Sequence, residues 1–304
     1  MSFPLTTLCM AIGLTVGLGS AAGFSLELGR KNEEKAGTIA GTAAGTLVIS
    51  PILSACFPRF QSVHSAPADF VPKVREPALI CRLGVNSFIF QFSNLLVQIT
   101  MNNVLHIYGE QSVYGADTPI AVAGIMMKIN AIFIALIIGL INGAQPICSY
   151  NYGAKKYGRV RQTVRLFLTA GVIISTVIWA VFQLFPRPII ALFGSGETDA
   201  LYFEYAIRFM RVYLAFVFLN GVQICATTFF PSIGKGTKGA ALSFAKLIVF
   251  LIPLILILPR FFGLDGVMYA TPAADFLSFL MAVVFLADEM RKMPREDIAE
   301  VING

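Results

Sequence analysis

Charged residues are scarce in this sequence. Only 13% of its 304 residues are Asp, Glu, Lys or Arg, whereas soluble domains carry about a quarter. Hydrophobic residues make up 56% of the chain and the mean hydropathy is +0.74. Such a chain cannot cover a water-exposed surface, so the composition excludes a soluble globular fold and is typical of a protein surrounded by lipid.

Histidine and clustered cysteine are also lacking. The two histidines, His64 and His106, are far apart, and the five cysteines are widely separated without a Cys-x-x-Cys pair. The sequence therefore predicts neither a metal site nor a cofactor. Neither Gly-x-Ser-x-Gly nor His-Glu-x-x-His occurs, which argues against an enzyme. The basic residues behind the net charge of +6 form short clusters between apolar segments, a pattern that excludes nucleic-acid binding.

Long apolar segments are abundant. Eight of them approach or exceed the roughly 20 residues that a helix needs to cross a bilayer. Lipid forces such segments into helices because it cannot satisfy their backbone polar groups. The sequence thus predicts an all-α, polytopic membrane helix bundle with about eight transmembrane helices. The expected spans are Leu5–Leu28, Ala36–Phe57, Ala78–Tyr108, Pro119–Tyr150, Val164–Phe185, Tyr205–Phe230, Ala240–Leu258 and Val267–Leu286.

The loops between the later spans differ in charge. Basic residues gather at 155–165, at 235–238 and at 291–295, whereas the alternate loops contain acids such as Glu110 and Asp265. Cytoplasmic loops are enriched in Lys and Arg. We therefore expect residues 77–290 to form a six-helix unit in the cell (plasma) membrane with both ends inside, followed by a cytoplasmic tail at 291–304.

Polar residues form stripes on three of the expected helices, and the third stripe is Thr271, Asp275 and Ser278 on the segment 267–286. On the segment 78–108 they recur every three or four positions and lie within an arc of about 80°. Polar groups at membrane depth need protein partners or water. We expect the stripes to line a substrate cavity; the alternative is that they only bond neighbouring helices together. The candidate cavity residues are Gln91, Asn94, Gln98, Asn102, Tyr213, Asn220, Gln223 and Thr227, with Ser87 extending the first stripe.

Asp275 is the acid placed deepest in an expected span, on one helical face with Thr271 and Ser278. A buried carboxylate must pair, coordinate a cation or take up a proton. Asp275 is thus a candidate cation or proton site; the alternative is a structural partner for a nearby hydroxyl or for Lys128. We expect Lys128 and Lys246 to extend to the membrane surface. Glu27, at the end of the first expected span, is expected to be solvated.

An internal repeat relates two loops. Leu28 to Asn32 matches Tyr152 to Lys156, so that Gly29 falls on Gly153, and Gly19 falls on Gly143. The segments after both loops also end in Phe-Pro-Arg. The matches suggest two halves related by a parallel repeat, an architecture that transporters use.

The loop after the fourth expected span carries a specific motif. Residues 142–155, followed by Arg159-Val160, resemble the Gly-x-Gln-Pro-x-x-x-x-Asn-x-Gly-Ala run of the multidrug and toxic compound extrusion (MATE) family. Residues 11–36 are similar to the second helix and following loop of that family, and residues 269–278 resemble its last helix. The motif residues are Gly143, Gln145, Pro146, Asn151, Gly153 and Ala154.

The resemblance implies the organisation of the chain. Members of this family have twelve helices in two lobes, so residues 77–290 resemble a complete C-terminal lobe. Residues 1–57 resemble a two-helix remnant of the N-terminal lobe, and residues 58–76 form a linker. Basic residues flank this linker at both ends although helix 36–57 should lead outward, so the charge pattern predicts a topological conflict there. Loss of an odd number of helices would explain it.

The resemblance also implies a function, with alternatives. It implies a prokaryotic efflux transporter that exchanges small amphipathic or cationic substrates for Na⁺ or H⁺ across the lipid bilayer. The coupling carboxylate that many members carry on the helix corresponding to 78–108 is absent here. The first helix of the family, which bears an aspartate in another branch, is missing. Transport should therefore be impaired; a transport-inactive remnant of a deleted gene and a lipid flippase of the same broad superfamily are the alternatives.

Overall fold

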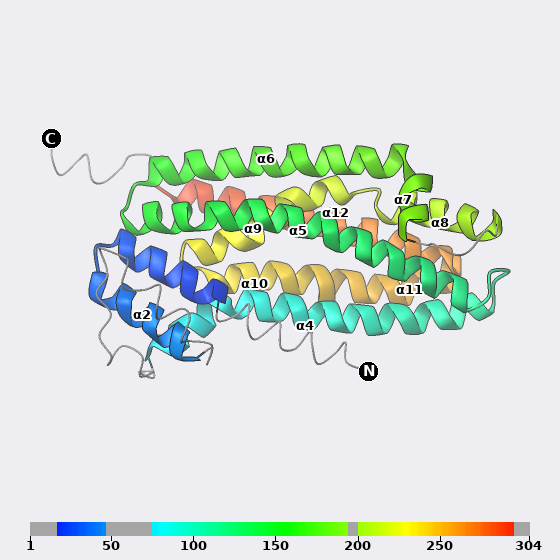
Figure 1. Cartoon of the computed structure of the whole chain (residues 1–304), viewed down its shortest axis with the longest axis horizontal. Coiled ribbons are helices and arrows are strands. Elements are labelled where there is room, and N and C mark those ends of the chain that lie inside the picture. Colours follow the sequence, from blue (N-terminus) through cyan, green and yellow to red (C-terminus); the bar gives the residue numbers. More distant parts are fainter. Residues whose placement is uncertain (1–16, 47–74, 194–199, 295–304) are drawn as a thin grey trace.

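The computed structural model describes residues 17–46, 75–193 and 200–294. Every element of regular structure in these ranges is a helix, and the long helices run side by side in an elongated bundle (Figure 1). The predicted polytopic helix bundle is confirmed. The linker at 58–76 and its topological conflict fall outside the described residues, apart from the start of the helix at residue 75.

Most of the bundle is built from helices long enough to cross a membrane. Within the described residues, four helical stretches are both long and apolar enough to do so: Asp117–Gly153, Tyr157–Leu184, Gly236–Phe262 and Asp265–Lys292. A fifth span results if two shorter helices, bent by 47° at their junction, are taken together. The elements are a helix over 17–29, α2 (Glu33–Thr46), α4 (Arg75–Glu110), α5 (Asp117–Gly153), α6 (Tyr157–Leu184), α7 (Pro186–Phe193), α8 (Ala200–Tyr213), α9 (Val217–Ser232), α10 (Gly236–Phe244), the π-helix η3 (Ala245–Leu251), α11 (Ile252–Phe262) and α12 (Asp265–Lys292).

Helix α9 lies at the centre and packs against α5, α6, α10 and α12. Small residues bring it close to α6: a Cβ atom added to Gly221 would lie 2.6 Å from the carbonyl oxygen of Gly171. Ser175 on α6 donates a 2.9 Å hydrogen bond to the carbonyl of Phe218. Close backbone approach of this kind is how helices pack in lipid, where apolar burial alone gives little drive to associate. Cys148 and Cys225 are buried in this core.

The two loops of the predicted repeat have the same backbone structure. Lys31 and Lys155, which occupy equivalent positions, both adopt positive φ, at 60° and 58°. The repeat is therefore borne out at these loops. Four backbone hydrogen bonds in the first loop have equivalents in the second. In the first loop they are Arg30 N–H to Leu26 O, Lys31 N–H to Leu28 O, Asn32 N–H to Glu27 O and Ala36 N–H to Asn32 O. In the second loop they are Ala154 N–H to Tyr150 O, Lys155 N–H to Tyr152 O, Lys156 N–H to Asn151 O and Val160 N–H to Lys156 O.

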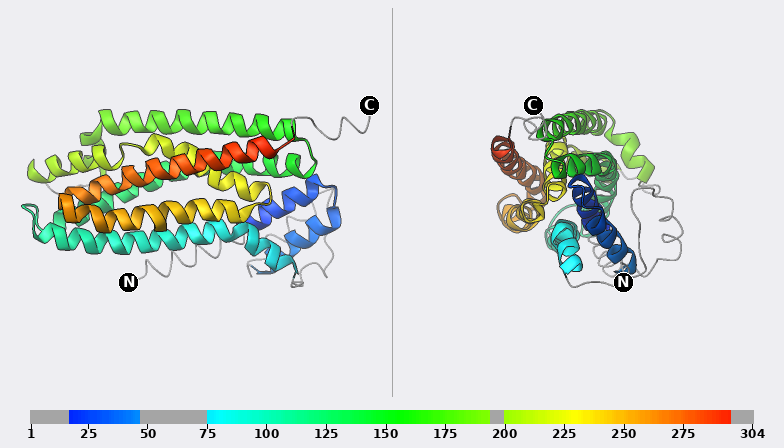
Figure 2. Two further views of the ribbon diagram at one scale, coloured as in Figure 1. Left: turned by 180° about the vertical axis from the view of Figure 1, so that it is seen from behind. Right: turned by 90° about the vertical axis from the view of Figure 1, so that its left-hand side faces the viewer.

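The two repeated loops also touch each other through glycine. A Cβ atom on Gly29 would lie 2.1 Å from the carbonyl oxygen of Tyr150, and one on Gly153 would lie 2.2 Å from that of Leu26. Helix 17–29 therefore crosses the end of α5 in backbone contact, at the end of the bundle where α2 lies (Figure 2). Only glycine permits this approach at either position.

Two buried glutamates anchor basic residues at the same end, which we call the basic end. Glu289 is 2% exposed, and its carboxylate pairs with Lys235 and, at 2.8 Å, with Lys238. Glu27 is 4% exposed and pairs with Arg30 at 2.8 Å and Lys35 at 3.3 Å. The expectation that Glu27 is solvated was wrong. Helix 17–29 packs against α5, and the Glu27 side chain is buried.

Replacing Glu289 with Gln should destabilise the basic end. The variant leaves Lys235 and Lys238 without their shared carboxylate, and lost hydrogen bonds to charged groups cost roughly 1.5–3 kcal/mol each. A lower thermal unfolding midpoint of the purified protein is the expected result. Asp288→Asn is the matched control because that side chain is 44% exposed. Equal shifts for the two variants would contradict the structural role of Glu289.

Candidate functional site

A closed polar network lies inside the bundle, formed by Asn220, Gln223, Lys246 and Asp275; we call it the lysine site. The ammonium nitrogen of Lys246 lies 3.0 Å from Asp275 Oδ1. It also donates to the side-chain oxygen of Asn220 and, at 3.4 Å, to that of Gln223. The amide of Asn220 in turn donates a 3.1 Å hydrogen bond to Asp275 Oδ2.

Three elements position these four side chains. Asn220 and Gln223 are three residues apart on α9 and therefore share a face. Lys246 is the second residue of the π-helix η3, and Asp275 follows Pro272 by one turn on α12. Helix α12 packs against both α9 and η3, which brings the charged residues together. Short π-helical turns are frequent at functional sites.

The lysine site is buried and carries no net charge as an ion pair. Asp275 is 2% exposed, and the side chain of Lys246 is 14% exposed. In the described part of the chain, Lys246 is the one charged side chain that contacts this carboxylate. Ionisable residues at membrane depth are costly and are usually functional. Lys246 is partly exposed, whereas the other three members of the site are buried.

The prediction for Lys246 was wrong. Its side chain does not extend to the membrane surface but turns into the bundle toward Asp275. Lys128, the other proposed partner of Asp275, is exposed on α5. The position of Lys246 in the middle of the apolar stretch 240–258 was the signal that could have identified it, because a lysine that far from either end needs a partner within the protein.

Within the described residues no hydrogen bond joins the predicted stripe on α4 to the lysine site, although α4 packs against η3, α9 and α12. Gln91, Asn94 and Gln98 are half-buried, whereas Asn102 is exposed. The side chain of Asn94 donates a 2.8 Å hydrogen bond to the carbonyl of Phe90 on its own helix. At 100° per residue the stripe runs along the edge between the buried face around Val97 and the exposed apolar face. Its role in a cavity stays a prediction.

The remaining predicted polar residues are buried around α8, α9 and α12. Tyr213, Thr227, Thr271 and Ser278 are all less than a tenth exposed. Thr227 and Ser278 donate hydrogen bonds to carbonyls one turn earlier on their own helices, at 2.9 Å and 3.0 Å. Tyr213 lies within electrostatic reach of Asp275. Thr271 and Ser278 lie about one helical turn before and after Asp275 on α12, and Thr227 lies about one turn after Gln223 on α9.

The motif residues lie near the basic end of α5. Gln145, Asn151 and Gly153 are buried, whereas Gly143 and Pro146 are exposed and Ala154 is half-buried. The amide of Asn151 donates a 2.8 Å hydrogen bond to the carbonyl of Ile147. The motif thus shapes the end of α5 and the tight loop that meets helix 17–29.

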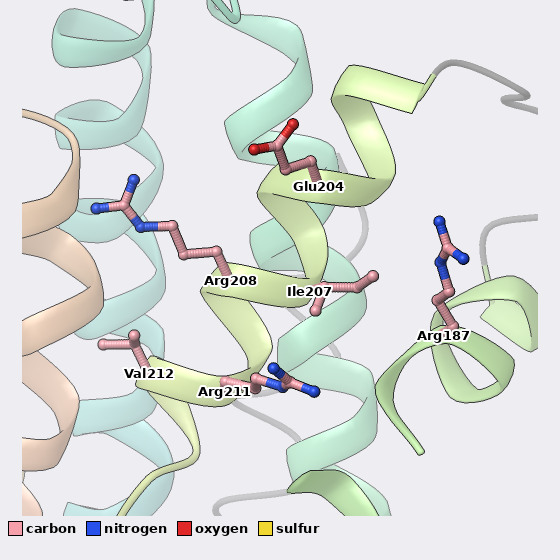
Figure 3. A pocket seen from close by; sticks show the side chains of 6 residues that line it. All are labelled: Arg187, Glu204, Ile207, Arg208, Arg211 and Val212. Atoms are coloured by element: carbon pink, nitrogen blue, oxygen red, sulfur yellow. The ribbon is translucent and has the colours of Figure 1, made fainter. Parts of the chain in front are cut away.

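A separate cavity of about 600 Å³ lies at the opposite end of the bundle, between α7 and α8. Its charged lining residues are Arg187, Glu204, Arg208 and Arg211, and the Arg208 side chain extends toward α12 (Figure 3). Arg208 is paired with Asp265 at 2.5 Å. Asp265 is ten residues before Asp275, or about 15 Å along an α-helix, so this cavity is distinct from the lysine site.

Known proteins resemble this chain in sequence. The MatE family model matches residues 87–257. The multidrug export protein MepA of Staphylococcus aureus (strain NCTC 8325) is 26% identical over 274 residues, which cover 88% of this chain and 57% of MepA. MepA of Staphylococcus haemolyticus is 24% identical and covers 87% of this chain and 57% of the relative. The chain thus spans little more than half the length of these relatives.

Solved structures resemble it in fold. An outward-facing multidrug resistance MATE family transporter of the MOP superfamily aligns with a TM-score of 0.82 at 15% identity, covering 97% of this chain and 87% of its own. A MOP superfamily transporter from Pyrococcus furiosus, described as having a binding pocket of reverse polarity, aligns with a TM-score of 0.80 at 14% identity and the same coverage. At these identities the likeness shows the fold alone.

Proposed function

This chain belongs to the MatE family, and we propose that it extrudes small amphipathic or cationic molecules across the cell membrane in exchange for H⁺ or Na⁺. The buried lysine site is the observation that carries the proposal. A carboxylate at membrane depth is costly to hold there, and Asp275 is held by Lys246 and by the amide of Asn220, groups that could also contact a substrate. Asp275 is the proposed cation or proton site.

The relatives support the direction of transport but not its rate. MepA is named a multidrug export protein, and this chain spans 57% of its length. We propose that residues 77–290 form one lobe of a transporter that has two lobes in its complete relatives. A single lobe cannot enclose a substrate between lobes, so we expect transport by this chain to be slow. If the transport rate is zero, the chain is a transport-inactive remnant.

Expression of the chain in a drug-sensitive bacterium tests the proposal. We expect a rise in resistance to cationic dyes that is smaller than the rise given by a full-length relative such as MepA, and that is abolished by Asp275→Asn. Lys128→Met is the matched control because it removes an exposed charge from α5. Resistance equal to that of the vector alone would favour the inactive remnant.

A lipid flippase is the second candidate. The polar stripe on α4 that borders an exposed apolar face is the feature that favours it, because a lipid headgroup could follow such an edge while its tails stay in the bilayer. Movement of a fluorescent phospholipid between leaflets of reconstituted vesicles measures this activity. Lipid movement without dye transport would favour the flippase.

A further inference from the structure

Arginines gather at the end of the bundle opposite the basic end. Arg187 on α7 and Arg208 and Arg211 on α8 all line the cavity of about 600 Å³ between these two helices. Lys and Arg are enriched in cytoplasmic loops, and the charge pattern of the loops predicts that this end faces outward. Topology therefore does not account for these arginines, which points to a local use for their charge.

Two of the three arginines have no acidic partner in the described part of the chain. Arg208 is paired with Asp265, whereas no ion pair joins Arg187 or Arg211 to a described carboxylate. Glu204 also lines the cavity and is exposed. The Arg208–Asp265 pair is neutral. The other two arginines and Glu204 therefore give the lining a net charge of +1.

Both of these arginines lie where an apolar stretch meets the membrane surface. Residues 166–186, which precede Arg187, contain no charged side chain, and neither do residues 212–234, which follow Arg211. As a helix, the 21 residues of the first stretch are about 31 Å long, which matches a hydrocarbon core of about 30 Å. The two guanidinium groups are therefore expected at the depth of the lipid headgroups.

Apolar side chains surround the same cavity. Ile207 and Val212 are its apolar lining residues. Within five residues of Arg187, the side chains of Leu184, Phe185 and Leu192 are 71%, 56% and 78% exposed. A phospholipid offers a phosphate to the arginines and acyl chains to these apolar residues. It therefore fits this surface better than a free phosphate does.

Contacts with α6 fix the position of the arginines. The side chain of Gln183, four residues before Arg187, donates a 3.0 Å hydrogen bond to the carbonyl of Arg211. The side chains of Ile207 and Arg211 extend from α8 toward the side where Arg187 lies (Figure 3). The planar guanidinium group presents a fork of N–H donors that matches the oxygens of a phosphate. Two such forks from adjacent helices make a site for one phosphate group.

We propose that this cavity binds the phosphate group of an anionic phospholipid in the membrane leaflet at this end of the bundle. Arg187 and Arg211 hold the phosphate oxygens, and the upper parts of the acyl chains lie against Ile207 and Val212. The net charge of +1 matches the single negative charge of a phosphodiester. A zwitterionic phospholipid has no net charge and leaves the +1 uncompensated. The site is distinct from the lysine site and does not depend on transport.

Quenching of tryptophan fluorescence tests the inference. Trp179 is the single tryptophan of the chain, and it lies eight residues before Arg187, or about 12 Å along a helix. The full chain is reconstituted in phosphatidylcholine vesicles, and phosphatidylglycerol with brominated acyl chains is added in increasing proportion. Brominated phosphatidylcholine is the reference quencher. We expect about a fivefold preference for phosphatidylglycerol, because one basic charge near the membrane surface contributes about that factor.

Variants of the lining residues should change this preference in opposite directions. Arg187→Gln and Arg211→Gln each lower the net charge to zero and should abolish it. Glu204→Gln raises the net charge to +2 and should increase the preference to about 25-fold. Arg260→Gln is the matched control, because it removes an exposed arginine of α11 that does not line the cavity. This control should keep the fivefold preference.

Inorganic phosphate separates a lipid site from a site for soluble phosphate. We expect that adding it does not relieve the quenching more than chloride of the same ionic strength does. Specific relief by phosphate would overturn the lipid assignment. Equal quenching by the two lipids in the wild type, or an equal loss of preference in Arg260→Gln and Arg187→Gln, would overturn the inference. Because no transport is measured, the result is independent of the proposed function.

Discussion

Replacing Lys246 with Met should lower the free energy of unfolding by about 3 kcal/mol, because removing one partner of a buried ion pair leaves the other uncompensated. Asp275 is 2% exposed and contacts no other charged group in the described part of the chain. The loss can be measured by unfolding the purified protein with denaturant in detergent. The double variant Lys246→Met/Asp275→Asn should recover most of it, because no charge is then left unpaired.

Lys128→Met provides the control for removal of a lysine from the bundle. Lys128 is exposed on α5, and surface changes of this kind usually alter stability by less than about 0.5 kcal/mol. The stability argument would be wrong if the single variants at Lys246 and Asp275 were as stable as the wild type, or if their effects simply added in the double variant.

Replacing Gly153 with Val should separate helix 17–29 from α5. The new Cβ atom would lie 2.2 Å from the carbonyl oxygen of Leu26, and backbone cannot move aside as a side chain can. Overpacking costs about 1–3 kcal/mol, and 2 kcal/mol corresponds to roughly a thirtyfold change in an equilibrium. Trypsin cleavage after Arg30 and Lys31 should therefore become roughly thirtyfold faster, since these residues lie in the loop held by the contact.

Gly143→Val is the matched control on the same helix. A Cβ atom at Gly143 meets nothing within 4 Å, so cleavage of this variant should match the wild type. Gly29→Val should reproduce the effect of the Gly153 variant from the other side of the contact. Equal cleavage rates for the Gly143 and Gly153 variants would show that the glycine crossing does not hold the two loops together.

Hydropathy predicted the helices of this fold but not their interruptions. The expected spans 119–150 and 267–286 lie within α5 and α12. The expected span 205–230, in contrast, is broken between Tyr213 and Val217, with no proline in the gap. Carbonyls near this break accept hydrogen bonds from α6, where Trp179 donates to Ala215 and Gln183 to Arg211. Partners so distant in sequence leave no local signal.

The candidate site was predicted only in part for the same reason. Asp275, Asn220 and Gln223 could be identified from the sequence because each interrupts an apolar segment. Lys246 was assigned to the membrane surface, since a single helix cannot show which neighbour a long side chain will reach. Its pairing depends on how η3 packs against α9 and α12, and the π-helical turn that directs it has no recognised sequence pattern.

The central claim is that an organic cation is exchanged for a proton at Asp275. Transport of a dye into vesicles tests this claim most directly. The full chain is reconstituted into proteoliposomes, a proton gradient is imposed, and transport of 1-naphthylmethylammonium is followed by fluorescence. The account predicts transport that depends on the gradient, is slower than that of a full-length relative, and is lost in Asp275→Asn while Lys128→Met retains it. Transport that persists after the gradient is collapsed, or that is unchanged in Asp275→Asn, would contradict it.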